Sequence, residues 1–204
     1  MFSEVLYVPG FQKKQKDVER GEKIVADNKK VFKDAGFELV LSEACYGGRP
    51  SYRPIASYGM DLKNEIERIH PLALFGHSMG CLEIQFAILR GLEFNGPLVL
   101  TEGPNKGAAA WKLWLTGFPL ERPCVQDMLK KSSLIKEIQG VKMPEHVLEI
   151  HGSLGEWWLS KDIFEKLPGS RLEVFPGVDH RVLPRNPEVV KTVLKFISTT
   201  VGDI

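Results

Sequence analysis

The sequence predicts an α/β fold: a doubly wound, mainly parallel sheet of about six strands with helices on both faces. Six short apolar runs recur along the 204 residues, and most of them are followed by a helical pattern. Their spacing is too wide for hairpins and suits strand–helix–strand crossovers, which build parallel sheets. No internal repeat or linker interrupts the chain, so we expect a single domain over residues 1–204.

Each run has a place in this order. The expected strands are Val5–Val8, Leu39–Leu41, Leu72–Phe75, Leu98–Leu100, Val147–Ile150 and Leu172–Phe175. The expected helices lie near residues 18–35, 58–69, 79–92, 125–138, 161–167 and 187–199. Gly36 suits the C-terminal end of the first helix, and Pro187 suits the first turn of the last. The long loop over residues 44–57 is expected near the entrance of a site.

Composition excludes several classes of partner. The chain has 27 basic and 26 acidic residues, a net charge of +1, so it shows no electrostatic footprint for nucleic acid. No apolar stretch approaches the roughly 20 residues needed to span a bilayer, and no signal-peptide pattern is visible. Three cysteines without metal-like spacing suggest free thiols in a reducing compartment, so we expect a cytoplasmic protein without a bound metal. The sequence does not indicate an oligomeric state.

The strongest chemical signal is the segment Gly76-His77-Ser78-Met79-Gly80. It follows an apolar strand-like run and precedes a helical pattern, which is the sequence form of a nucleophile elbow. Such a turn holds the serine hydroxyl at the sheet edge beside a helix N-terminus, where a nucleophile and an oxyanion are stabilised. The alternative is an ordinary strand-to-helix turn with a buried serine. We therefore test Ser78 as a nucleophile by looking for its partners.

A serine nucleophile needs a general base, and His180 has the required position. It follows the last strand, on a polar loop before the final helix, and the expected chain order is serine, acid, histidine. A capping or surface role is the alternative for His180. The other four histidines are less well placed. His77 lies inside the elbow, and His151 is followed by a tight turn. His70 and His146 lie at the wrong end of their strands.

The acid that orients the base is expected in the loop after the penultimate strand, where Glu156 is the only carboxylate. Glu102, just after the preceding strand, is a rival. Asp179 is a weaker one because it adjoins the base and is better suited to fixing its loop. The oxyanion donors are expected to be backbone N–H groups of Met79, which follows the nucleophile, and of Phe11, which follows the first strand.

These segments resemble the α/β-hydrolase superfamily and, within it, the small lipases and esterases. The resemblance covers the elbow, the Val8-Pro9-Gly10-Phe11 segment, the Gly-Pro loop over 101–107, the acid loop over 152–156 and the histidine loop over 176–180. It implies a catalytic triad of Ser78, Glu156 and His180 with no cofactor. Pro9 stands where the family usually has a histidine. About 40 residues separate the fourth and fifth strands, too few for a large cap domain.

Four tryptophans near these segments indicate what kind of substrate the site would bind. Trp111 and Trp114 recur at helical spacing and could form a short lid or an acyl-binding wall, although such stripes more often belong to a core. Trp157 and Trp158 adjoin the expected acid and could line the pocket. These four side chains favour a small, uncharged or lipid-like acyl ester.

The sequence therefore favours a serine hydrolase that cleaves a carboxylic ester through an acyl-enzyme. A thioesterase with the same triad is a close alternative. A catalytically weak hydrolase fold used as a binding module is the alternative from another class, motivated by Pro9 and by a glutamate in place of the usual aspartate.

Overall fold

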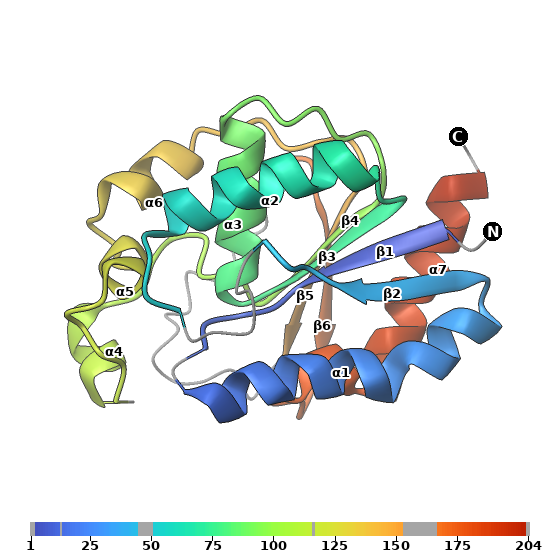
Figure 1. Cartoon of the computed structure of the whole chain (residues 1–204), viewed down its shortest axis with the longest axis horizontal. Coiled ribbons are helices and arrows are strands. Elements are labelled where there is room, and N and C mark those ends of the chain that lie inside the picture. Colours follow the sequence, from blue (N-terminus) through green and yellow to red (C-terminus); the bar gives the residue numbers. More distant parts are fainter. Residues whose placement is uncertain (1–2, 13, 45–50, 116, 153–166, 203–204) are drawn as a thin grey trace.

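The computed structural model describes residues 3–12, 14–44, 51–115, 117–152 and 167–202. Its centre is a six-stranded parallel sheet with strand order β2-β1-β3-β4-β5-β6 (Figure 1). All six expected strands are confirmed, and they span Ser3–Val8 (β1), Phe37–Leu41 (β2), Ala73–His77 (β3), Leu98–Thr101 (β4), Val147–Gly152 (β5) and Arg171–Phe175 (β6).

The apolar runs become strands because both faces of the sheet are covered. Alternate side chains of β1 enter two different cores: Leu6 and Val8 join one, whereas Val5 and Tyr7 join the other. Strands β3 and β4 pair in register from Leu74 with Leu98 to His77 with Thr101. The carboxyl ends of the parallel strands consequently meet at one edge of the sheet, where an α/β fold places its site.

Four long helices form the outer layers of the doubly wound sheet. Helices α1 (Gln15–Asp34) and α7 (Pro187–Gly202) lie on one side, and α2 (Ile55–Ile69) and α3 (Met79–Leu89) lie on the other (Figure 1). The apolar side chains of α1 and α7 pack in one core, and those of α2 and α3 pack in the second. Within the described residues, no helix is long and apolar enough to cross a membrane.

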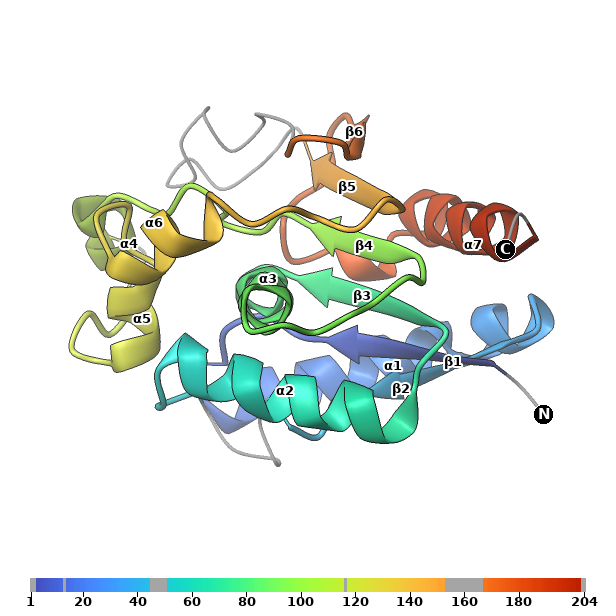
Figure 2. The ribbon, with the colours of Figure 1, turned by 90° about the horizontal axis from the view of Figure 1, so that it is seen from above.

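The segment between β4 and β5 differs from the expected single helix near 125–138. It carries α4 (Ala110–Leu115), α5 (Pro123–Asp127) and α6 (Ser133–Ile138), which are grouped at one end of the molecule (Figure 2). The chain breaks because Ser132 caps α6: its hydroxyl accepts the N–H of Ile135 over 3.1 Å. The helix expected near 161–167 lies almost entirely outside the described residues, as does part of the 44–57 loop.

Candidate active site

Ser78 lies between β3 and α3 in a backbone conformation that non-glycine residues rarely adopt. Its φ is 55° and its ψ is −122°, a strained geometry of the kind that concentrates at functional sites. The Ser78 N–H donates to the carbonyl oxygen of Thr101 on the neighbouring strand over 2.9 Å, which fixes the turn to the sheet. The Ser78 side chain is thereby held at the carboxyl edge, with the N-terminus of α3 next in the chain.

The two glycines of the elbow are closely packed. A Cβ at Gly80 would lie 2.3 Å from the carbonyl oxygen of Val8, and a Cβ at Gly76 would lie 2.7 Å from a methyl carbon of Ile84. Both distances are shorter than real Cβ contacts allow. Gly80 is therefore required by the backbone of β1, whereas a side chain at Gly76 would force the Ile84 side chain to move, in agreement with the motif.

The segment after β1 packs directly on the serine. A Cβ at Gly10 would lie 2.7 Å from Cβ of Ser78 and 3.3 Å from its Oγ. This contact brings Phe11, which lines the cavity at Ser78, beside the elbow. Met79 is the first residue of α3. The backbones of Phe11 and Met79 therefore lie on the two segments that flank the Ser78 side chain, which is where oxyanion donors are needed.

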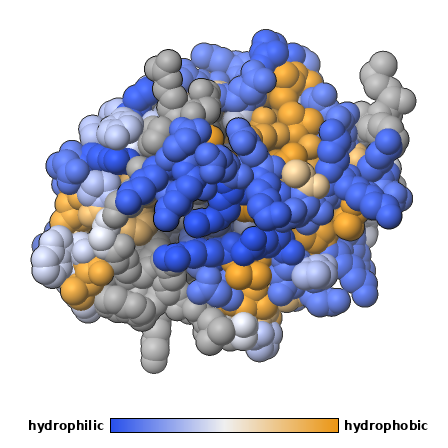
Figure 3. Space-filling view, turned by 60° about the horizontal axis from the view of Figure 1, so that its bottom comes forward, coloured by the Kyte–Doolittle hydropathy of each residue, from blue (hydrophilic) through white to orange (hydrophobic). Residues whose placement is uncertain are grey.

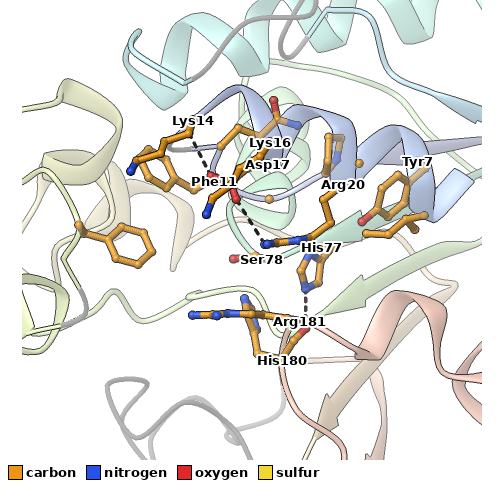
Figure 4. Close-up of a pocket in the computed structure, with 16 residues that line it drawn as sticks. Tyr7, Phe11, Lys14, Lys16, Asp17, Arg20, His77, Ser78, His180 and Arg181 are labelled. Carbon is orange, nitrogen blue, oxygen red and sulfur yellow. Dashed lines mark hydrogen bonds and ion pairs between the residues drawn. The ribbon is translucent and has the colours of Figure 1, made fainter.

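His180 lies at the same cavity and is held by a buried carboxylate. Its Nδ1 is 2.6 Å from Oε2 of Glu102, and the exposed fractions of the two side chains are 9% and 2%. Because a carboxylate only accepts, Nδ1 carries the proton in this contact, and the neutral ring then has its lone pair on Nε2. In the close-up, the His180 ring faces the Ser78 oxygen (Figure 4).

Glu102 reaches the histidine through an unusual backbone turn. Its φ is 46°, in the left-handed region, directly after β4. Its second oxygen, Oε1, accepts the N–H of Gly152 over 2.7 Å. A Cβ at Gly152 would lie 2.1 Å from the carbonyl oxygen of Val178, so glycine there lets the histidine loop approach the end of β5. The carboxylate thus has a donor on each oxygen.

The contact expected of Glu156 is therefore made by Glu102, the rival carboxylate. Glu156 lies outside the described residues, and so do Trp157 and Trp158. The sequence held one signal in favour of Glu102: it follows the strand that pairs directly with the elbow strand β3. Its left-handed backbone could not be read from the sequence, because glutamate gives no sign of positive φ.

His77 supports the histidine loop from the opposite side, a role that the sequence analysis missed. Its Nε2 lies 3.0 Å from the carbonyl oxygen of His180, and the two ring centroids are 4.7 Å apart. Burial, followed by the proximity of His180, lowers the pKa of His77 to about 3. The ring is therefore neutral near pH 7, and its Nε2–H donates to His180. Asp179 fixes the same loop, as expected, by accepting the N–H of Arg181 over 2.9 Å.

The cavity at Ser78 has a volume of about 310 Å³ and two kinds of wall. One wall is aromatic: the rings of Phe11 and Phe118 stack with their centroids 5.0 Å apart. The other is cationic and comes from the start of α1 and from the histidine loop (Figure 4). Its charged members are Lys14, Lys16, Asp17, Arg20 and Arg181.

Two of the tryptophans expected at the pocket, Trp111 and Trp114, do not line it. Among the described residues, Trp111 and Trp114 are 59% and 66% exposed, and neither contributes to the cavity wall. The reason is the orientation of α4: Leu113 is its fully buried member, which turns the tryptophans toward solvent. The side chain that this region supplies to the cavity is Phe118. Also within the described part of the chain, no cluster of three or more His, Cys, Asp or Glu residues could hold a metal ion.

Comparison with solved structures identifies the fold. A carboxylesterase of the ammonia-oxidizing thaumarchaeon Nitrososphaera gargenis superposes with a TM-score of 0.65 over 100% of this chain and 92% of its own, at 14% identity. The Paleococcus ferrophilus monoacylglycerol lipase gives a TM-score of 0.61 over 95% and 94%, at 16% identity. A bromoperoxidase from Bacillus anthracis gives 0.64 over 97% and 92%, at 14% identity. The chain has the α/β-hydrolase fold. No protein-family model and no curated protein matches the sequence.

In this α/β-hydrolase fold, the segment between β4 and β5 is part of the main body. Leu113 of α4, Val125 of α5 and Ile135 of α6 all belong to the core that α2 and α3 share. The short helices α5 and α6 therefore pack against α2 and α3, and Phe118 between α4 and α5 lines the cavity.

Proposed function

We propose that this protein is a serine hydrolase that cleaves a carboxylic ester through an acyl-enzyme. The observation that carries the proposal is the 2.6 Å contact of His180 with Glu102 at the cavity that also contains the strained Ser78. A nucleophile, a base and an acid that orients the base form the unit that acyl transfer requires.

In the proposed reaction, Ser78 Oγ attacks the ester carbonyl while His180 Nε2 accepts its proton. Glu102 holds the ring in the required tautomer and stabilises the imidazolium as it forms. His180 then gives the proton to the leaving alcohol, and the acyl group stays on Ser78. Water, deprotonated by the same histidine, attacks the acyl-enzyme and releases the acid. Glu102 takes the role that we first expected for Glu156.

The tetrahedral intermediates carry a negative oxygen that must be stabilised. Backbone N–H groups of Met79 and Phe11 are the proposed donors, supported by the close approach of Gly10 to Ser78. The N-terminus of α3 lies at the same place and adds its dipole. The aromatic wall of Phe11 and Phe118 provides an apolar surface for part of the substrate.

A fluorophosphonate activity probe tests this proposal directly. The wild type should be labelled and should hydrolyse p-nitrophenyl butyrate, and Ser78→Ala should lose both properties. Ser133→Ala, on the exposed first residue of α6, is the matched control and should behave like the wild type. Absence of labelling in the wild type, or equal labelling of Ser78→Ala, would refute the proposal and favour a binding module.

A further inference from the structure

The cavity at Ser78 is much more basic than the protein as a whole. The chain has a net charge of +1, yet the cavity wall carries four cationic side chains and one carboxylate. The cations are Lys14, Lys16, Arg20 and Arg181, and the carboxylate is Asp17. Hydrophilic side chains also dominate the middle of the surface that carries α1 (Figure 3). A neutral ester alone gives no reason for this concentration of positive charge.

Two of the cations lie next to the reacting groups. Arg20 extends from α1 toward Ser78 and His77, and Arg181 lies on the other side of the Ser78 oxygen (Figure 4). The Arg20 charge is close enough to His77 to contribute to the lowering of its pKa. Asp17 directs Arg20, since its Oδ1 lies 3.4 Å from a guanidinium nitrogen while its Oδ2 accepts the Lys14 N–H over 3.0 Å. The Arg20 side chain remains 44% exposed and can therefore contact a ligand.

Buried polar atoms at the same cavity point to a ligand independently. The Tyr7 hydroxyl and Oε1 of Gln12 have no hydrogen-bond partner among the described residues, although these residues are 0% and 3% exposed. Both residues line the cavity. A buried polar group without a partner costs roughly 1 to 3 kcal/mol, so such groups in a cavity wall are suited to contacts with a bound molecule. The Tyr7 hydroxyl can donate to an oxygen of an anion or of the ester.

We infer, on the basis of the function proposed above, that the ester cleaved at Ser78 carries an anionic group, a carboxylate or a phosphate, which Arg20 and Arg181 bind. Guanidinium groups suit both anions because their N–H donors match two oxygens at once. The stacked rings of Phe11 and Phe118 then hold the uncharged part of the substrate. This proposal differs from the expectation from sequence, which favoured an uncharged ester.

Matched pairs of esters test the inference. On the acyl side, the monophenyl ester of adipic acid is compared with phenyl hexanoate. On the alcohol side, 4-(carboxymethyl)phenyl butyrate and 4-(phosphonomethyl)phenyl butyrate are compared with 4-methylphenyl butyrate, where the methylene keeps the leaving groups similar. At low salt, kcat/KM for at least one anionic ester should exceed that of its neutral partner by about tenfold. The two alcohol-side esters distinguish a carboxylate from a phosphate, which the phosphonate group represents.

The arginines should account for this preference. Arg20→Gln and Arg181→Gln should each lower the anionic-to-neutral ratio several-fold, whereas Lys23→Gln should keep the wild-type ratio. Lys23 is the matched control because it lies on the same helix, pairs with Asp27 and is not part of the cavity wall. Raising the salt concentration from about 0.02 to 0.5 M should also reduce the ratio, since exposed charges are screened.

Failure of this inference is distinguishable from failure of the proposed function. Ser78-dependent hydrolysis with every anionic-to-neutral ratio at or below one would overturn the anionic substrate and leave the hydrolase intact. A preference that persists unchanged in both arginine variants would also overturn it. Loss of Ser78-dependent labelling and turnover altogether would overturn both.

Discussion

His77 donates from its side chain to the backbone of His180, with Nε2 of the first 3.0 Å from the carbonyl oxygen of the second. The residue before Ser78 therefore holds the loop that carries His180. Glu102 holds the same histidine through its ring, at Nδ1. The position of His180 is thus determined by one contact to its main chain and one to its side chain.

The burial of His77 predicts a pH dependence of stability. Its folded pKa is lowered to about 3, so between pH 6.5 and 3 the unfolded chain binds a proton that the folded chain excludes. Stability must therefore fall as the pH drops below 6.5. Between pH 7 and 5, we expect His77 to cost the wild type about 2 kcal/mol of unfolding free energy.

Urea denaturation of His77→Gln at the two pH values measures this effect, and the variant should lose less stability than the wild type on acidification. His70→Asn is the control, because His70 is exposed and has a left-handed backbone that asparagine tolerates. Equal acid sensitivity of His77→Gln and the wild type would show that another group is responsible.

Replacement of Glu102 by glutamine should reduce kcat/KM by about 10²- to 10⁴-fold, because an amide neither fixes the histidine tautomer nor stabilises the imidazolium. The fold should survive, since the amide oxygen can still accept the N–H of Gly152. Glu156→Gln is the comparison and should stay within a few-fold of the wild type. Circular dichroism checks the fold, and p-nitrophenyl butyrate hydrolysis gives the rates. The opposite ranking would return the acid role to Glu156.

Gly10→Ala should reduce kcat/KM by about 10²- to 10³-fold, the typical effect of losing an oxyanion donor. The added Cβ would lie 2.7 Å from Cβ of Ser78, so the segment that carries Phe11 must move away from the serine. Gly140→Ala is the control, since its nearest contact would be an ordinary 3.6 Å. Slower labelling by a fluorophosphonate probe should accompany the loss. Wild-type labelling of Gly10→Ala would contradict the placement of the oxyanion donor.

Two buried tyrosines should respond differently to loss of their hydroxyl groups. Tyr7→Phe should leave the unfolding free energy unchanged or raise it by about 1 kcal/mol, because its hydroxyl has no partner among the described residues. Tyr58→Phe should lower it by about 1 to 2 kcal/mol, since the hydroxyl accepts the N–H groups of Tyr52 and Arg53. Thermal denaturation of both variants checks the contrast. A similar loss in the two variants would show that Tyr7 has a structural partner.

The sequence was sufficient to predict the strands because burial on both sides of a parallel sheet leaves an apolar run for each one. It was also sufficient to predict that Ser78 and His180 lie at one cavity. Ser78 stands in a Gly-x-Ser-x-Gly segment between a strand and a helix, and His180 stands between the last strand and the last helix. The prediction of one helix over 125–138 was wrong because a capping serine inside a mostly helical pattern divides it.

Features that depend on backbone angles or on helix orientation could not be predicted from the sequence. The left-handed turn at Glu102 brings that carboxylate to His180, and nothing in the residue type indicates it. Trp111 and Trp114 point outward because Leu113 is the buried residue of α4. A helix of six residues is too short for its hydrophobic periodicity to show which face is buried. The cationic wall of the cavity could not be predicted from the sequence, because Arg20 and Arg181 are about 160 positions apart and come together only at the edge of the sheet.

The register of β3 with β4 has a mechanical consequence. His77 and Thr101 face each other across the two strands, so Ser78 and Glu102 each follow one member of the same pair. Ser78 and Glu102 are therefore carried by adjacent backbones about 4.8 Å apart, tied by ladder hydrogen bonds rather than by a long loop. The connection from β5 to β6 is not needed to hold this spacing.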